Sequence, residues 1–303
     1  MAAAADTVSL HDTVTNRIIR ELEQGRIPWV QPWASSGTTP LGLPLNAATS
    51  RAYSGVNILL LWAAALEQGR SSQRWLTFKQ ALSLGGAVRK GEKGTMVVYA
   101  DTFIPKAEQE KASTSGEDPR RVGFLKRFTV FHVEQCDGLP ADPEAKPLPG
   151  RTEVLPMAEA VIAATGADIR VGGDMAFYAP SHDFIMVPPQ EAYFEPINWY
   201  RTKLHELTHW TGHPLRLNRD FSGRRGGEAY AREELVAELG SAFICAELGI
   251  APTVRHADYI GAWLDVLKGD NRAIFQAASL ASKAANFVMG RGVTGALQPD
   301  HVA

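Results

Sequence analysis

Cysteine is scarce in this chain of 303 residues, which contains only two. Cys136 and Cys245 lie far apart and neither has a second cysteine nearby, so a disulfide scaffold, a thiolate metal site and a redox pair are excluded. Long apolar runs are also missing, because the longest, residues 58–66, is far shorter than the roughly 20 residues of a membrane-spanning helix. The start, MAAAAD, has neither a basic nor a long apolar segment. We therefore predict a cytoplasmic protein that does not enter a membrane.

A strong charge of one sign is absent as well, since 31 Lys plus Arg face 33 Asp plus Glu. The charge is uneven along the chain, however: residues 1–135 carry +4 and the remainder −6. Where the sign changes, residues 137–151 contain four Pro and two Gly, a composition typical of an exposed linker. The length fits two domains with cores of their own. We predict an N-terminal domain at 1–136, a linker at 137–151 and a C-terminal domain at 152–303.

Hydrophobic periodicity gives the first domain a mixed character. It predicts helices at 10–23, 57–68 and 77–84, followed by strands at 95–103 and 122–133. The polar run between the strands, residues 106–121, predicts a mobile loop. Helices beside a small antiparallel sheet define an α+β domain.

Basic and aromatic residues alternate through this first domain. Cations can follow the phosphates of single-stranded nucleic acid while flat rings stack on unpaired bases, which favours DNA binding without sequence preference. The alternative is that the rings are core residues, and composition alone leaves that open. The candidate DNA-binding residues are Arg26, Trp29, Trp33, Tyr53, Asn57, Arg74, Trp75, Lys90 and Lys93.

The strongest chemical signal is the segment His205-Glu-Leu-Thr-His209. Two histidines four residues apart on a helix share one face, a spacing at which both imidazoles can bind one zinc ion. Glu206 lies beside them and can act as general base toward a water activated by the metal. Pro196 early in the stretch and Gly212 with Pro214 after it bound the predicted helix.

The third metal ligand has to come from another segment. The pattern HExxHxxGxxH fails, because Leu215 stands at the third histidine position. A helix predicted at 230–240 offers Glu234 and Glu238 on one face, so we assign Glu234 to the metal and Glu238 to a position where it orients a ligand histidine. Glu233 competes for the ligand role, because the preference for Glu234 rests on the ExxxE spacing alone.

The rest of the second half predicts a mainly helical domain around this metal motif. Two β-prone runs, 175–180 and 183–187, suggest a hairpin ahead of the metal helix, and helices are expected at 256–268 and 271–289. The basic segment 216–225 is a second candidate feature, which could hold an acidic substrate or a phosphate backbone.

Several of these segments resemble a known family. PWVQPW (28–33), SRAYSGVN (50–57), RWLTFKQALSLGGAVRKGEKG (74–94) and FTVFHVEQCDGL (128–139) are similar to the N-terminal domain of ArdC-type antirestriction proteins, which also occurs in TraC-type plasmid primases. YRTKLHELTHWTGHPLRLNR (200–219) and YAREELVAELG (230–240) resemble their C-terminal zincin-like domain. Two features depart from the pattern: His132 stands where Asn is expected, and residues 106–121 look like a variable insert.

The resemblance implies an N-terminal domain that binds single-stranded DNA and a C-terminal domain with a metallopeptidase-like fold. It also implies a plasmid-encoded protein that protects incoming conjugative DNA from host restriction. The expected cofactor is Zn²⁺, although other divalent ions suit two imidazoles and a carboxylate. The expected partners are single-stranded DNA and, for the peptidase domain, host restriction enzymes or another protein substrate.

Three hypotheses remain open from the sequence. The first is an antirestriction protein in which DNA binding and a zinc peptidase site both contribute. The second is a metallopeptidase whose N-terminal domain recognises a protein substrate. The third is a DNA-binding shield whose metal is purely structural.

Overall fold

The computed structural model describes residues 9–30, 42–115, 118–140, 151–221, 226–251 and 259–290. The N-terminal helix begins where its sequence provides a cap. Helix α1 spans Leu10–Glu23, the predicted range, and buries Val14, Ile18 and Leu22 on one face. Ser9 accepts a hydrogen bond from the Asp12 amide, and the Asp12 carboxylate accepts one from the Ser9 amide. This reciprocal pair satisfies amides that the first helical turn leaves without partners.

A four-stranded sheet follows α1 in the N-terminal domain. Its order is β1-β2-β5-β4, with β1 (Leu45–Asn46) parallel to β2 (Arg74–Thr77), while β5 (Val122–His132) is antiparallel to both β2 and β4 (Thr95–Phe103). Helix α2 (Val56–Glu67) packs beside β4, and the short helix α3 (Phe78–Ser83) follows β2. A second small sheet pairs β3 (Ala87–Val88) with β6 (Cys136–Asp137), which a 3-10 turn at Val133–Gln135 precedes. Strand β2 was not predicted, because its four residues are too few to show alternation.

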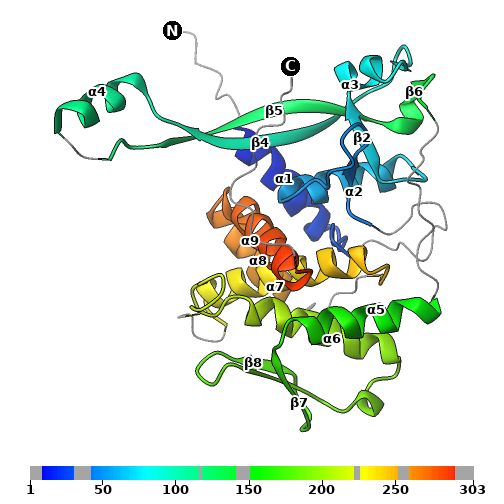
Figure 1. Ribbon diagram of the computed structural model, residues 1–303, viewed down its shortest axis with the longest axis vertical. Helices are drawn as coiled ribbons and strands as arrows, with labels where there is room; N and C mark the ends of the chain where they lie inside the picture. The colour runs from blue at the N-terminus through cyan, green and yellow to red at the C-terminus, as the bar shows by residue number, and fades with distance from the viewer. Residues whose placement is uncertain are drawn as a thin grey trace.

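The β4–β5 hairpin continues beyond the sheet as a two-stranded arm that carries helix α4 (Lys106–Ser115) at its end (Figure 1). The prediction of a loop throughout 106–121 is therefore wrong. The reason is that α4 is polar along its whole length, so it has no apolar stripe, although its Ala, Glu, Gln and Lys residues have good helix propensity.

The C-terminal domain is mainly helical, as predicted. Helix α5 (Arg151–Ala164) leads into a three-stranded sheet of order β7-β9-β8, formed by Asp168–Val171, Phe184–Val187 and Phe177–Ala179. Strands β8 and β9 form the predicted hairpin, and β7 adds to β9 in parallel. After a 3-10 turn at Gln190–Ala192 come helices α6 (Pro196–Trp210), α7 (Glu228–Glu247), α8 (Ile260–Gly269) and α9 (Ala273–Val288).

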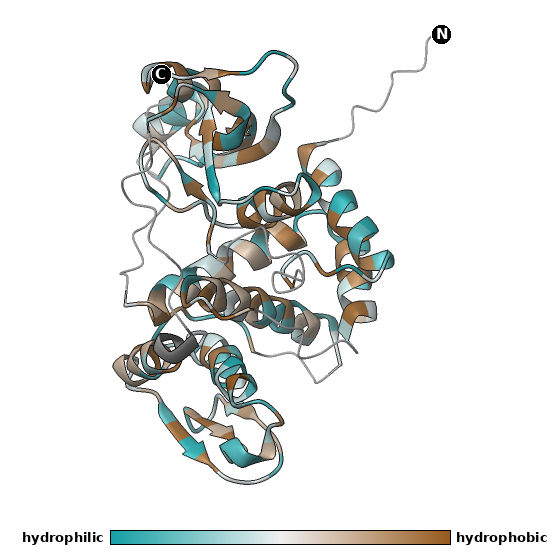
Figure 2. Cartoon of the chain, turned by 90° about the vertical axis from the view of Figure 1, so that its right-hand side faces the viewer, coloured by the Kyte–Doolittle hydropathy of each residue, from teal (hydrophilic) through white to brown (hydrophobic). Residues whose placement is uncertain are grey.

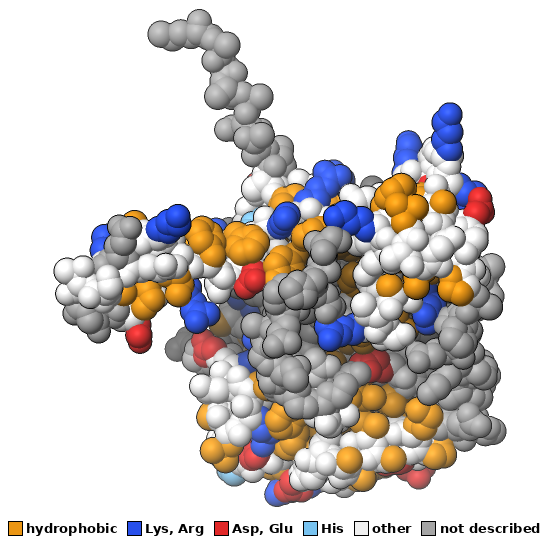
Figure 3. Space-filling model, turned by 45° about the horizontal axis from the view of Figure 1, so that its top comes forward, with side chains coloured by type: hydrophobic (Ala, Val, Ile, Leu, Met, Phe, Trp, Pro, Cys, Tyr) orange, Lys and Arg blue, Asp and Glu red, His pale blue; other side chains and the backbone are white. Residues whose placement is uncertain are grey.

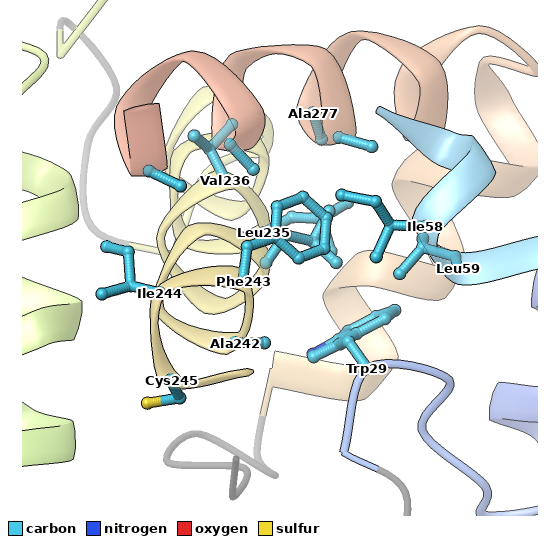
Figure 4. Close-up of a cluster of buried hydrophobic side chains, with 14 of the residues drawn as sticks. Trp29, Ile58, Leu59, Leu235, Val236, Ala242, Phe243, Ile244, Cys245 and Ala277 are labelled. Atoms are coloured by element: carbon cyan, nitrogen blue, oxygen red, sulfur yellow. The ribbon is translucent and has the colours of Figure 1, made fainter. Parts of the chain in front are cut away.

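The two domains share one hydrophobic core. The ring of Trp29 meets that of Trp263 on α8 at 5.6 Å between centroids, and Trp62 on α2 meets Phe243 on α7 at 5.7 Å. Figure 4 shows Trp29 and the side chains of α2 directed at α7, and Figure 2 shows hydrophobic positions along the central helices. A second, smaller cluster around Leu61, Trp75 and Val130 lies within the N-terminal domain alone. The predicted domain bounds stay a prediction, and residues 141–150 of the predicted linker lie outside the described residues.

The predicted α+β class is confirmed, since the described residues combine helices with three antiparallel or mixed sheets. Among the described residues, none of the helices combines the length and the hydropathy that a membrane crossing requires.

Candidate metal centre

Helix α6 presents both histidines of the HExxH motif inside the protein. Pro196 occupies its first turn, where the missing amide hydrogen costs nothing, and the helix ends at Trp210. His205 and His209 are both buried, and their ring centroids lie 4.9 Å apart. The i, i+4 spacing on a helix therefore brings two imidazoles together, as the sequence predicts.

Helix α7 brings a carboxylate to these two rings. Nε2 of His205 lies 3.5 Å from Oε2 of Glu234, and Nε2 of His209 lies 3.5 Å from Oε1 of the same residue. Two ligands bound tetrahedrally to one ion at about 2.1 Å would be separated by about 3.4 Å. The donor set of two imidazoles and one carboxylate therefore fits a divalent metal ion in composition and in spacing.

A glycine allows α6 and α7 to approach closely enough for this geometry. A Cβ atom at Gly240 would lie 2.5 Å from Cγ2 of Thr208, a distance that real Cβ atoms do not adopt. Thr208 precedes His209, and Gly240 lies near Glu238, so this contact sets the distance between the histidines and the carboxylates.

Each histidine has a second carboxylate on its opposite nitrogen. Nδ1 of His209 lies 3.1 Å from Oε1 of Glu233, and Nδ1 of His205 lies 3.8 Å from Oε1 of Glu238. Such partners orient an imidazole and make its other nitrogen a better ligand. The structure thus brings Glu238 near the outer nitrogen of His205, and its orienting role stays a prediction. Glu233 lies on the far side of His209 rather than between the two histidines.

Arg219 holds Glu233 in this position. Its Nε and Nη2 donate to the Glu233 carboxylate at 3.0 and 2.8 Å, and further hydrogen bonds join it to the Thr208 carbonyl and the Thr211 hydroxyl. Gly212 leaves room for the guanidinium, because a Cβ there would lie 2.9 Å from Arg219 Nη2. Sequence reasoning missed this role, since no local pattern distinguishes a buried arginine from a solvated one.

The hypothesis that residues 216–225 hold a substrate is wrong for its two arginines that the structure describes. Arg219 is buried against Glu233, and Arg216 pairs with Asp183 and stacks on the Trp210 ring. Residues 222–225 lie outside the described residues.

The charges around His209 favour its protonated form in the protein without metal. Burial opposes that charge, but the hydrogen bonds and charges of Glu233 and Glu234 outweigh burial and raise the pKa of His209 to about 10. Burial alone would raise the pKa values of Glu233 and Glu234. Hydrogen bonds and charges from His209 and Arg219 instead lower the pKa of Glu233, and those from His205 and His209 lower the pKa of Glu234. A metal ion bound between these groups would therefore displace the proton that His209 carries in the metal-free protein.

Two further side chains complete the site. Glu206 follows His205 on α6 and is buried. Tyr230, one helical turn before Glu234, was not predicted; burial and hydrogen bonds with Tyr259 and Glu234 raise its pKa. The signal in the sequence was its place at the start of YAREELVAELG.

The structure overturns the stacking role for two of the predicted DNA-binding residues. Trp29 and Trp75 each have 0% of their surface exposed, so neither ring can receive a base. Trp29 belongs to the shared core, and Trp75, part of a second buried cluster, packs edge-on against His132, its partner on β5. Trp33 lies outside the described residues.

Asn57 is also engaged within the fold. Its side-chain amide donates to the Val98 carbonyl and accepts from the Val98 amide, both at 2.8 Å, which fastens α2 to β4. Tyr53 is half-buried, and burial raises its pKa to about 12. The predicted DNA contact through Asn57 stays a prediction, since its side chain is only partly buried.

The predicted cations are more accessible. Lys90 and Lys93 are exposed in the loop between β3 and β4, and no described residue forms an ion pair with either. Arg26 is exposed and pairs with Glu21 at 2.6 Å, while Arg74 is half-buried.

Comparison with known proteins agrees with this architecture. Residues 9–131 match the family described as the N-terminal domain of anti-restriction factor ArdC, and residues 156–280 match the family described as zincin-like metallopeptidase. The chain belongs to the ArdC-type antirestriction family, as the motifs predicted.

Similar proteins cover nearly all of the chain. The crystal structure of antirestriction ArdC protein from the R388 plasmid, in its metal-free form, is 40% identical, has a TM-score of 0.77 and aligns over 93% of this chain and 97% of that chain. Its Mn(II)-bound form is 37% identical with a TM-score of 0.76, over 95% of this chain and 100% of that chain. The protein y4eC of Sinorhizobium fredii, described as uncharacterized, is 40% identical over 282 residues, which are 92% of this chain and 91% of the relative. DNA primase TraC of Escherichia coli is 40% identical over 92% of this chain, but the match covers only 27% of the primase.

Proposed function

We propose that this protein protects incoming plasmid or conjugative DNA from host restriction by combining a DNA-binding domain with a zinc metallopeptidase domain. The observation that carries the proposal is the buried set of His205, His209 and Glu234, with Glu206 beside it, in a chain that also has an ArdC-type N-terminal domain. The work is expected to take place in the cytoplasm, where incoming DNA meets restriction enzymes.

The metal site is proposed to hold Zn²⁺ through His205, His209 and Glu234. A bound Zn²⁺ ion supplies Lewis acidity and lowers the pKa of a coordinated water toward neutrality. Glu206 accepts the proton of the attacking water and passes it to the leaving amine of the cleaved peptide. Glu238 and Glu233 hold the two imidazoles in orientation from behind. The Mn(II)-bound form of the related ArdC protein supports a site for a divalent ion.

The N-terminal domain is proposed to bind single-stranded DNA without sequence preference. Lys90, Lys93, Arg26 and Arg74 would contact phosphates, and Tyr53 is the described aromatic candidate from the sequence that is not fully buried. The surface pair between Arg26 and Glu21 does not prevent this, because exposed ion pairs are weak and exchange readily. Host restriction enzymes or another protein are the proposed substrates of the peptidase domain.

The test separates DNA binding from peptidase chemistry. Purified protein is titrated with labelled single-stranded and duplex oligonucleotides over a range of salt concentrations, and conjugation into a restricting host is measured for wild type and Glu206→Gln. We expect tight, salt-sensitive binding to the single strand in both proteins, and lower protection with Glu206→Gln. Glu191→Gln, an exposed glutamate ahead of α6, is the matched control and should protect as wild type does.

Two outcomes would contradict the proposal. Full protection by Glu206→Gln would favour a DNA-binding shield with a structural metal. Failure of the wild type to bind any oligonucleotide at low salt would favour a metallopeptidase whose N-terminal domain recognises a protein.

A further inference from the structure

The arm formed by β4 and β5 extends past the sheet that anchors it. Strand β2 opposes β5 only at residues 130–132, whereas β4 pairs with β5 as far as Phe103 and Val122. Figure 1 shows the arm projecting from the body of the molecule toward α4. A ribbon of two strands is marginally stable without a third strand or a helix on its face, so the composition of that face is informative.

Four aromatic rings form a continuous row on one face of the arm. The register places Phe128 opposite Val97, Tyr99 opposite Lys126, and Phe124 opposite Asp101, so these side chains and Phe103 point to the same side. Centroid distances are 6.0 Å for Phe103 and Phe124, 6.2 Å for Tyr99 and Phe124, and 6.2 Å for Tyr99 and Phe128. We call Tyr99, Phe103, Phe124 and Phe128 the aromatic row.

The outer part of the aromatic row is open to solvent. Phe103 is 50% exposed and Phe124 is 38% exposed, as is the neighbouring Val122. Figure 3 shows hydrophobic side chains and Lys or Arg side chains next to each other along the projecting arm. Large exposed apolar patches on a soluble protein mark binding surfaces, and flat rings in a row suit a ligand that stacks.

The charge of the arm indicates the kind of ligand. Its strands and the residues just before β5 carry four cations, Arg120, Arg121, Lys126 and Arg127, against the carboxylates of Asp101 and Asp118. Of the strand cations, Lys126 lies on the same face as the aromatic row. The carboxylate of Asp101 accepts hydrogen bonds from the Tyr99 hydroxyl at 2.6 Å and from the Thr102 amide at 2.7 Å, so it is engaged within the arm. The ammonium group of Lys126 lies 5.2 Å from the centroid of Phe128.

We propose that the aromatic row is the stacking platform for single-stranded DNA, with Lys126 on the same face of the arm and Arg121 just before β5 binding the phosphates alongside. This inference rests on the proposed function and locates its DNA contact. The exposed rings of the aromatic row can stack on bases, whereas the buried rings of Trp29 and Trp75 cannot. Rings that stack on unpaired bases together with cations on the backbone give binding that tolerates any sequence.

The experiment uses the full-length protein and a labelled oligothymidylate, with affinity measured by fluorescence anisotropy across a salt titration. Phe124→Leu keeps an apolar side chain but removes the flat ring, and Phe124→Tyr keeps the ring. We expect Phe124→Leu and Phe103→Leu each to weaken binding about fivefold or more, and Phe124→Tyr to bind as wild type does. Phe194→Leu is the matched control, since Phe194 is fully exposed in the C-terminal domain and should have no effect.

Salt dependence separates the rings from the cations. Loss of a ring should leave the slope of log affinity against log salt unchanged, because stacking releases no counterions. Lys126→Ala should reduce the slope by roughly 0.7 if it loses one phosphate contact, whereas Arg127→Ala, on the opposite face of the arm, should leave the slope unchanged. Thermal unfolding of every variant, followed in parallel, shows that the arm remains folded.

Three results would overturn the inference. Wild-type affinity in the Phe103→Leu/Phe124→Leu double variant would move the DNA contact elsewhere while the proposed function stands. A self-associating wild type whose dimer disappears in the double variant, with DNA affinity unchanged, would make this face an interface between copies. Absence of DNA binding in the wild type itself would remove the proposed function along with the inference.

Discussion

Glu233 lies 3.1 Å from Nδ1 of His209, on the side of the imidazole that faces away from Glu234. The same carboxylate accepts two hydrogen bonds from Arg219, which in turn is fixed to the backbone of α6 at Thr208. When the ring of His209 is neutral, as a metal ligand must be, the chain of Arg219, Glu233 and His209 keeps its hydrogen on Nδ1. It therefore presents Nε2 as the ligand atom.

Removing the guanidinium should affect both stability and metal binding. Arg219→Ala leaves the buried Glu233 carboxylate without its main partner, so we expect a loss of roughly 3–5 kcal/mol in the free energy of unfolding. Glu233→Gln should fold but bind metal about 10- to 100-fold more weakly, because the orienting charge behind His209 is lost. Urea unfolding and metal titration measure the two effects. Arg232→Ala is the control: its partly exposed ion pairs with Glu228 and Asp270 should each contribute about 0–1 kcal/mol.

The ligand assignment predicts a clear division among the acidic residues. His205→Ala and Glu234→Ala should each lose most bound metal, because three protein ligands are the minimum for such a site. Glu206→Gln should keep full metal content, and Glu238→Gln should weaken binding without abolishing it. Elemental analysis of each purified variant gives the stoichiometry. If Glu234→Ala retained a full equivalent of metal while Glu233→Ala did not, the two residues would have to exchange roles.

Features that depend on neighbouring residues were predictable from the sequence. Helix α1 and strand β4 have the predicted bounds, because hydrophobic periodicity is a local pattern. The HExxH helix was found for the same reason, since an i, i+4 pair on a helix needs no knowledge of the rest of the fold.

Features that depend on distant partners were not predictable. Trp29 looks the same in sequence whether it faces solvent or Trp263, which lies more than 200 residues away in the chain. Arg219 reads as a surface cation until α7 brings Glu233 to it. Glu233 and Glu234 are neighbours on one helix, and only the packing of α6 against α7 decides which of them faces both histidines.

The pKa of His209 makes the stability of the metal-free protein depend on pH. Its pKa rises from 6.5 to about 10 in the folded protein, so the stabilisation from the protonated ring is fully present below pH 6.5 and is lost as the pH rises through 10. We expect the metal-free protein to lose stability over this range, and His209→Gln to lose less. Thermal unfolding in chelator at several pH values measures this. Equal pH profiles for the two proteins would show that His209 does not carry the proton.

Metal uptake should then release protons above pH 7. A metal ligand must be the neutral imidazole, so binding at pH 8 has to displace the proton that His209 holds in the metal-free protein. We expect about one proton released per ion, measured by calorimetry in buffers of different ionisation enthalpy. Metal binding that releases no proton at pH 8 would contradict the charge arrangement described for the cluster.

The contact between Gly240 and Thr208 should limit what α7 tolerates. Gly240→Ala forces the new methyl group to within 2.5 Å of Thr208 Cγ2, so the helices must separate, at a cost of about 1–3 kcal/mol. Metal affinity should fall as well, because the separation moves Glu234 away from the histidines. Adding Thr208→Ser removes the clashing methyl group and keeps the hydroxyl that donates to the Leu204 carbonyl, so the double variant should recover much of both losses. Gly261→Ala, in helix α8 with nothing within 4 Å of the added carbon, should be neutral or slightly stabilising. A double variant no more stable than Gly240→Ala alone would show that the helix spacing is set elsewhere.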